Sequence, residues 1–210
     1  MKILITSGPT RQYLDPVRFI SNASSGTMGR ELAQAALTAG NSVVVVTGPV
    51  KVVYPAAAHV IEVETTDQML EACLEHFPSC DGLIGAAAPC DYRPIEIANH
   101  KIRKTGQPLE IKLVETADIV AKLGQMKRPD QWTVGFALET EDAHFRAITK
   151  LQRKSCDIVA INSPAAIDSD SNSIEIVNPA GDIVHRVSGS KAKVAESIIQ
   201  FIEQNLVRRR

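Results

Sequence analysis

Short runs of apolar, mostly β-branched residues without polar alternation constrain the fold of this chain more than any other feature. The clearest are ILIT at residues 3–6 and SVVVVT at residues 42–47. A strand without a polar face has to be covered on both sides, which is typical of a parallel sheet between two layers of helices. Segments of helical apolar spacing separate these runs, so the sequence predicts an α/β, Rossmann-like, doubly wound and mostly parallel sheet.

The expected elements follow this alternation along most of the chain. Strands are expected at residues 3–6, 42–47, 60–64, 82–87, 109–114, 133–137 and 157–161. Helices are expected at residues 30–39 and 66–77, in a segment capped by Thr116, and in a segment that ends near Lys154. Residues 91–104 are polar and charged, and we expect them to be irregular.

The last forty residues change in character. Residues 173–177 and 183–187 flank the turn sequence NPAGD, which predicts a β-hairpin, and an amphipathic helix follows from Ser190. We expect one domain over residues 1–210, with this hairpin as a small C-terminal element.

Composition limits the partners and the compartment. A formal charge of −1 and a pI near 6.5 give no electrostatic reason to expect nucleic acid or an acidic membrane. The four cysteines lack CxxC spacing, Met1 leads directly into a strand, and no apolar run approaches the ~20 residues of a spanning helix. The five histidines have no metal-ligand spacing, so we expect neither zinc nor triad chemistry. A reduced, cytoplasmic protein is expected.

The long connection between the first strand and the first helix is the first candidate site. Its glycines, hydroxyls and amide lie at Gly8, Asn22, Ser24, Ser25 and Gly26. A strand that leads through such a loop to a helix N-terminus brings free N–H groups and the positive end of the helix dipole together. The connection therefore predicts an anion or nucleotide site.

Later loops add charged and small residues at the same expected edge of the sheet. Asp91 follows the strand that ends GAA at residues 85–87, where a carboxylate suits a Mg²⁺ ligand, a contact to a base or merely a turn cap. The cations Lys101, Arg103 and Lys104 could cover a triphosphate or form a solvated turn.

Two further positions leave their role open. Phe136 closes a strand and could flank a base or fill the core. Lys150 and Lys154 are spaced i, i+4 on one helix face, where like charges repel unless an anion bridges them, which favours a phosphate or ribose contact.

The motifs together resemble those of phosphopantothenoylcysteine synthetase, the phosphopantothenate–cysteine ligase of coenzyme A biosynthesis. The resemblance rests first on GPTRxxxDPVRFISNxSSGxMG between Gly8 and Gly29, then on an AAxxDYR match that ends at Arg93. A KxKK-like and a GFAAET-like motif and a lysine pair before a strand ending at Asn162 follow in the family's order. The departures from the pattern are Pro89, Cys90, Arg103, Ala117 and Leu138.

The resemblance implies a reaction and its partners. It implies that 4′-phosphopantothenate and L-cysteine are joined at the expense of CTP through an acyl-cytidylate, with Mg²⁺ bound and pyrophosphate and CMP released. CTP rather than ATP rests on similarity to bacterial members alone. The resemblance also implies a homodimer, with the C-terminal hairpin region as a candidate interface. Many bacterial members carry a preceding flavin-dependent decarboxylase domain, for which this chain has no room.

The resemblance also implies residue roles. Asn22 and Lys101 would be catalytic, Arg18 and Asn22 would bind phosphopantothenate, and Asp91 would contact Mg²⁺. The residues that would bind the nucleotide are Gly8, Ser24, Ser25, Gly26, Gly85, Ala86, Ala87, Asp91, Lys101, Ala117, Asp118, Ile119, Val120, Phe136, Lys150 and Lys154.

Two other functions compete with this ligase. An NAD(P)-dependent oxidoreductase would need GxGxxG after the first strand and an acid at the end of the second, which instead ends in Thr47 and Gly48. A non-catalytic nucleotide- or flavin-binding module would explain the loop but would leave Asn22 and the lysines without a role.

Overall fold

The structure, a computed structural model, describes residues 1–138, 151, 153–162 and 171–207. Its centre is one eight-stranded sheet of order β12-β11-β10-β9-β6-β1-β4-β5. The parallel strands are β1 (Lys2–Ser7), β4 (Ser42–Thr47), β5 (His59–Glu62), β6 (Gly82–Gly85), β9 (Trp132–Leu138) and β10 (Ile158–Asn162). The order reverses between β1 and β6, as in doubly wound folds, so the predicted fold class is confirmed.

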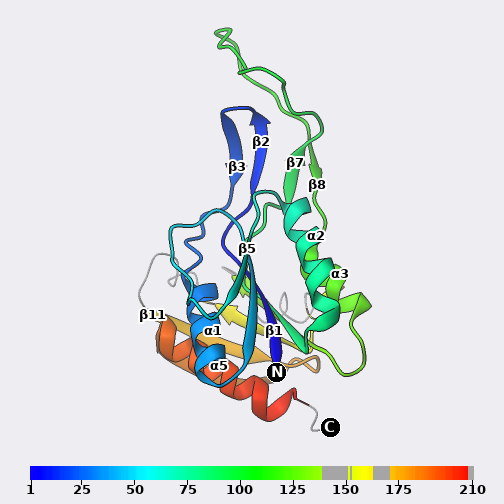
Figure 1. The fold of residues 1–210 in the computed structure, drawn as a ribbon. Helices are drawn as coiled ribbons and strands as arrows, with labels where there is room; N and C mark the ends of the chain where they lie inside the picture. The colour runs from blue at the N-terminus through cyan, green and yellow to red at the C-terminus, as the bar shows by residue number, and fades with distance from the viewer. Residues whose placement is uncertain (139–150, 152, 163–170, 208–210) are drawn as a thin grey trace.

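Helices cover both faces of the sheet, which is why the central strands have no polar side. On one face α1 (Thr27–Thr38) packs beside α5 (Lys191–Asn205); on the other lie α2 (Thr66–His76), the 3₁₀ turn η1 (Phe77–Ser79) and α3 (Ile119–Met126) (Figure 1). Each face of the sheet has its own hydrophobic core, and alternate residues of β1 pack into them: Ile3 and Ile5 on the side of α1, and Leu4 on the side of α2. Among the described residues, no helix has the length and hydropathy needed to cross a membrane.

The predicted C-terminal hairpin is confirmed but belongs to the main sheet. Its strands are β11 (Ser171–Val177) and β12 (Ile183–Ser190), and β11 pairs antiparallel with β10 from Val159↔Val177 to Asn162↔Ile174. Because β12 again runs in the direction of the parallel strands, α5 begins at the same edge of the sheet as α1.

The chain also forms an arm that the sequence analysis missed. The arm consists of the antiparallel pairs β2 (Arg11–Asp15) with β3 (Arg18–Ser21) and β7 (Tyr92–Pro94) with β8 (Leu113–Glu115), together with residues 95–112. Both pairs extend side by side from the sheet (Figure 1). The first pair lies where a loop was expected, and β7 begins the segment expected to be irregular. The β2–β3 pair is a local hairpin whose polar and proline-containing sequence reads as a loop. The β7–β8 pair joins residues about twenty positions apart, which local periodicity does not reveal.

Several element boundaries differ from the expected ones. Helix α1 begins at Thr27, three residues early, and Asp118 caps α3 by accepting a hydrogen bond from the Ala121 N–H at 3.1 Å. Thr116, the expected cap, instead donates its hydroxyl to the Cys90 carbonyl at 2.6 Å. The helix expected before Lys154 lies largely outside the described residues.

Candidate functional site

A small cavity lies where the strand order reverses, beyond the carboxyl ends of β1 and β6. This switch-point cavity measures about 200 Å³ and is lined by residues 23–29 and 86–88 and by Phe136, Ala137, Asn162, Asn172 and Lys191. In open α/β sheets, ligands bind at this position. The cavity brings together the predicted Ser24, Ser25, Gly26, Ala86, Ala87 and Phe136.

A larger hollow of about 800 Å³ lies over β4, β5 and α2. Its charged lining consists of Arg11 and the carboxylates of Glu62, Glu64, Glu71 and Glu75. Excess negative charge disfavours a phosphate there. The smaller switch-point cavity therefore fits an anionic ligand better.

The loop before α1 presents free donors to the switch-point cavity. Gly26 occupies the N-cap position with φ 76°, a conformation that favours glycine, and this residue has no side chain to cap the helix. The Thr27 N–H donates to the Ser25 hydroxyl at 3.4 Å, and the N–H groups that follow it in the first turn of α1 lack helical partners. A Cβ on Gly29 would lie 2.0 Å from Ser7 Oγ, so α1 can approach β1 only with glycine there. These features suit an anion, and the phosphate loop stays a prediction.

The segment after β6 forms the neighbouring wall and is tied to β1. The Ala88 N–H donates to the Gly8 carbonyl at 2.9 Å, and the Ala87 N–H donates to Thr6 Oγ1 at 3.3 Å. Gly8 thus supports this wall and does not line the cavity. Gly85 is needed for packing, since a Cβ there would lie 2.5 Å from Val120 Cγ2.

Asn22 links the two loops. Its amide nitrogen donates to the carbonyls of Ala88 at 3.3 Å and Pro89 at 2.9 Å, while its side chain remains exposed. Cys90, which follows Pro89 and departs from the family pattern, is buried and donates its thiol hydrogen to the Thr10 carbonyl at 3.3 Å. Burial raises the pKa of this thiol. The Pro89 and Cys90 departures are therefore accommodated by the adjoining loop.

Arg18 and Lys101 lie in the arm, outside the lining of the switch-point cavity. The fully buried carboxylate of Asp15 accepts hydrogen bonds from the N–H groups of Val17, Arg18 and Ile102 at 2.8, 2.9 and 3.1 Å. The Arg18 guanidinium donates to the Ile102 carbonyl at 2.7 Å. Asp15 and Arg18 therefore fix the backbone at Ile102, next to Lys101. The side chain of Lys101 itself is exposed.

Electrostatics at Asp15 favour its ionised form. Burial alone would raise the pKa of this carboxyl, but the backbone hydrogen bonds from Val17, Ile102 and Arg18 and the charge of Arg18 lower it overall. The anchor of the Lys101 segment is therefore charged at neutral pH.

Asp118 and Lys154 form an ion pair at the start of α3. Lys154 Nζ lies 3.0 Å from Asp118 Oδ2, and Arg153 Nη2 lies 3.5 Å from the same oxygen. Burial would raise the pKa of Asp118, but the charge of Lys154 and the Ala121 N–H outweigh it and lower the pKa. Lys154 was predicted to contact the ligand; in this structure its partner is Asp118, next to the predicted Ala117, Ile119 and Val120.

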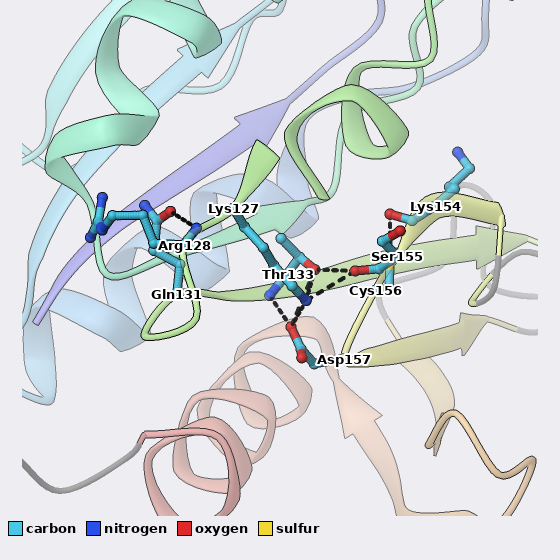
Figure 2. Close-up of polar contacts among 8 residues, drawn as sticks. All are labelled: Lys127, Arg128, Gln131, Thr133, Lys154, Ser155, Cys156 and Asp157. Carbon is cyan, nitrogen blue, oxygen red and sulfur yellow. Dashed lines mark hydrogen bonds and ion pairs between the residues drawn. The ribbon is translucent and has the colours of Figure 1, made fainter. Parts of the chain in front are cut away.

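A polar cluster around Lys127 and Asp157 fixes the turn that carries Lys154. The Lys127 ammonium donates to Asp157 Oδ2 at 2.6 Å and to the Ser155 carbonyl at 3.0 Å, and Thr133 bonds the same two groups (Figure 2). The Lys154 side chain extends away from this cluster (Figure 2). The cluster therefore positions Lys154 without using its charge.

The remaining predicted residues are placed as follows. Phe136 is half-buried, packs against the core and also lines the cavity, so both proposed roles fit it. Asp91 is exposed and lies outside the cavity lining. Within the described ranges, no three His, Cys, Asp or Glu side chains gather as for a metal. Lys150 lies outside the described residues.

On the wall formed by β10, β11 and α5, three polar or charged residues were not predicted as site residues: Asn162, Asn172 and Lys191. The other lining residues that were not predicted are Ala23, Thr27, Met28, Gly29, Ala88 and Ala137. Asn172 shares a face of β11 with the buried Ile174 and Ile176, because side chains alternate along a strand. A polar residue on the apolar face of a strand was the signal available in the sequence.

Comparisons with known proteins show which sequences this chain resembles. A model of the family described as "DNA/pantothenate metabolism flavoprotein C-terminal domain" matches residues 1–206. A protein of an unknown prokaryotic organism, named cysteine/cysteine sulfinic acid decarboxylase, is 41% identical over 207 residues, covering 96% of this chain and 57% of that protein. The coenzyme A biosynthesis bifunctional protein CoaBC of Haemophilus influenzae is 36% identical, covering 97% of this chain and 52% of that protein. The chain thus spans about half the length of these curated relatives.

Solved structures extend the likeness to the fold. The crystal structure of the C-terminal domain of a coenzyme A biosynthesis bifunctional protein CoaBC has a TM-score of 0.82 and 35% identity, covering 98% of this chain and 95% of that one. A DNA/pantothenate metabolism flavoprotein from Streptococcus pneumoniae has a TM-score of 0.84 at 24% identity, covering 97% of this chain and 99% of that one. The second match supports the fold alone.

Proposed function

We propose a ligase function for this chain, which belongs to the DNA/pantothenate metabolism flavoprotein C-terminal domain family. The proposed reaction joins 4′-phosphopantothenate and L-cysteine in coenzyme A biosynthesis, with CTP as co-substrate. The observation that carries the proposal is the switch-point cavity, where the uncapped N-terminus of α1 and two serines meet and none of the described lining residues is a carboxylate.

The proposed reaction has two steps. A carboxylate oxygen of phosphopantothenate attacks the α-phosphorus of CTP, and the bond from that phosphorus to the bridging oxygen breaks, which releases pyrophosphate and leaves an acyl-cytidylate. The cysteine amine then attacks the acyl carbon, loses a proton, and CMP leaves with the electrons of the carbon–oxygen bond. Both steps depend on orientation and on the exclusion of water from the mixed anhydride.

The chain's own groups suit the first step. The hydroxyls of Ser24 and Ser25 and the α1 N–H groups can donate to phosphate oxygens. Asn22 is uncharged and already ties the two walls together, so it can orient the intermediate without attacking it. Lys101, on the segment anchored by Asp15, would reach over the nucleotide and contribute in the cysteine step.

Binding of the base and ribose is proposed for the residues around α3. Val120 packs against the small residue Gly85 at the carboxyl end of β6, and Lys154 pairs with Asp118 in the same segment. Phe136 lines the cavity on the next strand, β9. A nucleotide that lies across the carboxyl ends of β6 and β9 would place its phosphates toward α1. We include Lys150 by its motif position alone.

Mg²⁺ is the proposed metal. One carboxylate, Asp91, is sufficient when the substrate phosphates supply the other ligands, as is common for Mg²⁺. The ion would neutralise charge on the polyphosphate.

We also propose that residues 1–210 act as one domain in a cytoplasmic homodimer. The C-terminal hairpin offers less apolar surface for the dimer than the arm does. Exposed apolar side chains of the arm include Phe19, Ile97, Leu109 and Val114. Replacing Ile97 and Val114 together by glutamate should give monomers in sedimentation equilibrium, and an unchanged mass would count against this interface.

The decisive assay measures pyrophosphate release with phosphopantothenate and cysteine, using CTP, ATP and no nucleotide in parallel. CTP-dependent release accompanied by phosphopantothenoylcysteine supports the proposal. Carbon dioxide release from cysteine alone would favour the activity named for one relative. NADH binding without pyrophosphate release would favour an oxidoreductase, and CTP or flavin binding without turnover would favour a non-catalytic module.

A further inference from the structure

Asn172 is a buried polar side chain without a partner among the described residues. Only 5% of it is exposed, and within the part of the chain that the structure describes neither its amide nitrogen nor its carbonyl oxygen forms a hydrogen bond. An unpaired buried amide costs free energy, so such a group requires a reason. Because Asn172 lines the switch-point cavity, a ligand there can supply the missing partner.

Two neighbouring groups on the same wall also lack partners among the described residues. The side-chain oxygen of Asn162, at the end of β10, is buried and has no hydrogen-bond donor within those ranges, although as an acceptor it does not itself favour an anion. Lys191 lines the cavity, and we find no ion pair or hydrogen bond of its side chain among the described residues. It is the first residue of α5, whose N-terminal dipole end adds positive potential.

The opposite wall has the same preference for negative charge. There the uncapped N-terminus of α1 faces the cavity with Ser24 and Ser25. Helices α1 and α5 pack side by side and begin at the same edge of the sheet (Figure 1). Lys191 is the one charged side chain among the described residues that line the cavity.

We infer that Asn172 and Lys191 bind the pyrophosphate portion of the nucleotide, across the cavity from Ser24 and Ser25. The inference rests on the proposed function and adds two specific residues to it. A cavity of about 200 Å³ is small for a whole nucleoside triphosphate and suits phosphate groups. When the bond between the α-phosphorus and the bridging oxygen breaks, negative charge grows on the leaving pyrophosphate, and the Lys191 ammonium stabilises it there.

The test measures binding of magnesium pyrophosphate, CTP, CMP and phosphopantothenate by calorimetry. Asn172→Leu, Asn172→Asp and Lys191→Gln should weaken CTP and pyrophosphate binding by roughly 10- to 100-fold, because each removes a hydrogen bond or charge contact to an anion. CMP binding should change little. Lys193→Gln is the matched control: it removes an exposed cation from the same turn of α5, outside the cavity. Ligand-free Asn172→Leu should melt at or above the wild-type temperature, since it loses an unpaired amide.

The outcomes separate this inference from the proposed function. If the wild type binds CTP and all three variants match the control, the inference is wrong while the ligase proposal stands. If the wild type binds neither CTP nor pyrophosphate, both fail. Loss of phosphopantothenate binding with unchanged pyrophosphate binding would assign the wall to the other substrate and overturn the inference. A lower melting temperature of Asn172→Leu with normal pyrophosphate binding would make Asn172 purely structural.

Discussion

Lys154 Nζ lies 3.0 Å from Asp118 Oδ2, which connects the turn before β10 to the N-cap of α3. The two side chains are 16% and 31% exposed, so solvent screens this pair less than a surface ion pair. The pair holds the start of α3 beside the carboxyl end of β6, where the base and ribose are proposed to bind. A nucleotide phosphate that reached Lys154 would compete with Asp118 for its ammonium group.

The Asp118 charge should stabilise the fold in a pH-dependent way. Because the pKa of Asp118 is lowered on folding, its contribution is present above its unfolded pKa and is lost as the pH falls through the folded pKa. Asn is as good an N-cap as Asp, so Asp118→Asn isolates the charge and should cost about 1 kcal/mol at pH 7. Urea unfolding at several pH values should show the difference shrinking toward pH 3. A difference independent of pH would contradict this account.

Asp15 should control the mobility of the Lys101 segment. In Asp15→Asn one oxygen can still accept from Val17 and Arg18, but the amide group then faces the N–H of Ile102. We expect trypsin to cut after Lys101 and neighbouring basic residues faster, by on the order of tenfold.

Asp182→Asn, in the turn between β11 and β12, is the control for this proteolysis experiment. It should leave the cleavage rate in the arm unchanged. Equal rates in the wild type and Asp15→Asn would show that the segment is held by other contacts.

Asn22→Asp should separate the two proposed steps. The change replaces a donor by an anion opposite the carbonyls of Ala88 and Pro89 and beside the intermediate. Rapid-quench analysis should find acyl-cytidylate formed or accumulated, while product formation falls by on the order of 100-fold. Asn178→Asp, in the β11–β12 turn, controls for the change in charge. Product formation at the wild-type rate would refute the role of Asn22.

Asp91→Asn should raise the Mg²⁺ concentration needed for half-maximal pyrophosphate release, on the order of tenfold, because one metal contact is lost. Chelation should abolish release in both proteins. Asp67→Asn, another exposed carboxylate, is the control. An identical Mg²⁺ dependence would remove Asp91 from the metal site.

The four cysteines should react slowly in the native protein. All are free and buried, and burial raises the pKa of Cys73 to about 12 and that of Cys156 to about 11. At pH 8 the thiolate fraction of these two is lower than that of a free cysteine by at least roughly 100-fold. Thiol titration should therefore be slow until denaturant is added, when four groups react at once. Rapid reaction of native Cys73 would contradict its burial.

Part of the candidate site could be predicted because its residues are close in sequence. Ser24, Ser25 and Gly26 are contiguous and directly precede α1, so their convergence on a helix N-terminus is a local property. Asn172 and Lys191 reach the same cavity only because β11 pairs with β10 and β12 returns the chain to that edge. No local pattern links these residues to the loop after β1.

The sequence by itself determined the class of fold, because apolar strands without polar alternation have to be covered on both faces, and it determined the glycine- and serine-rich loop that leads into α1, whose geometry is local. Only the tertiary structure decided that Lys154 pairs with Asp118, that Asp15 anchors the Lys101 segment, and that two helix N-termini share one cavity. These relationships depend on strand order and long-range pairing, which bring together residues that local periodicity treats as independent.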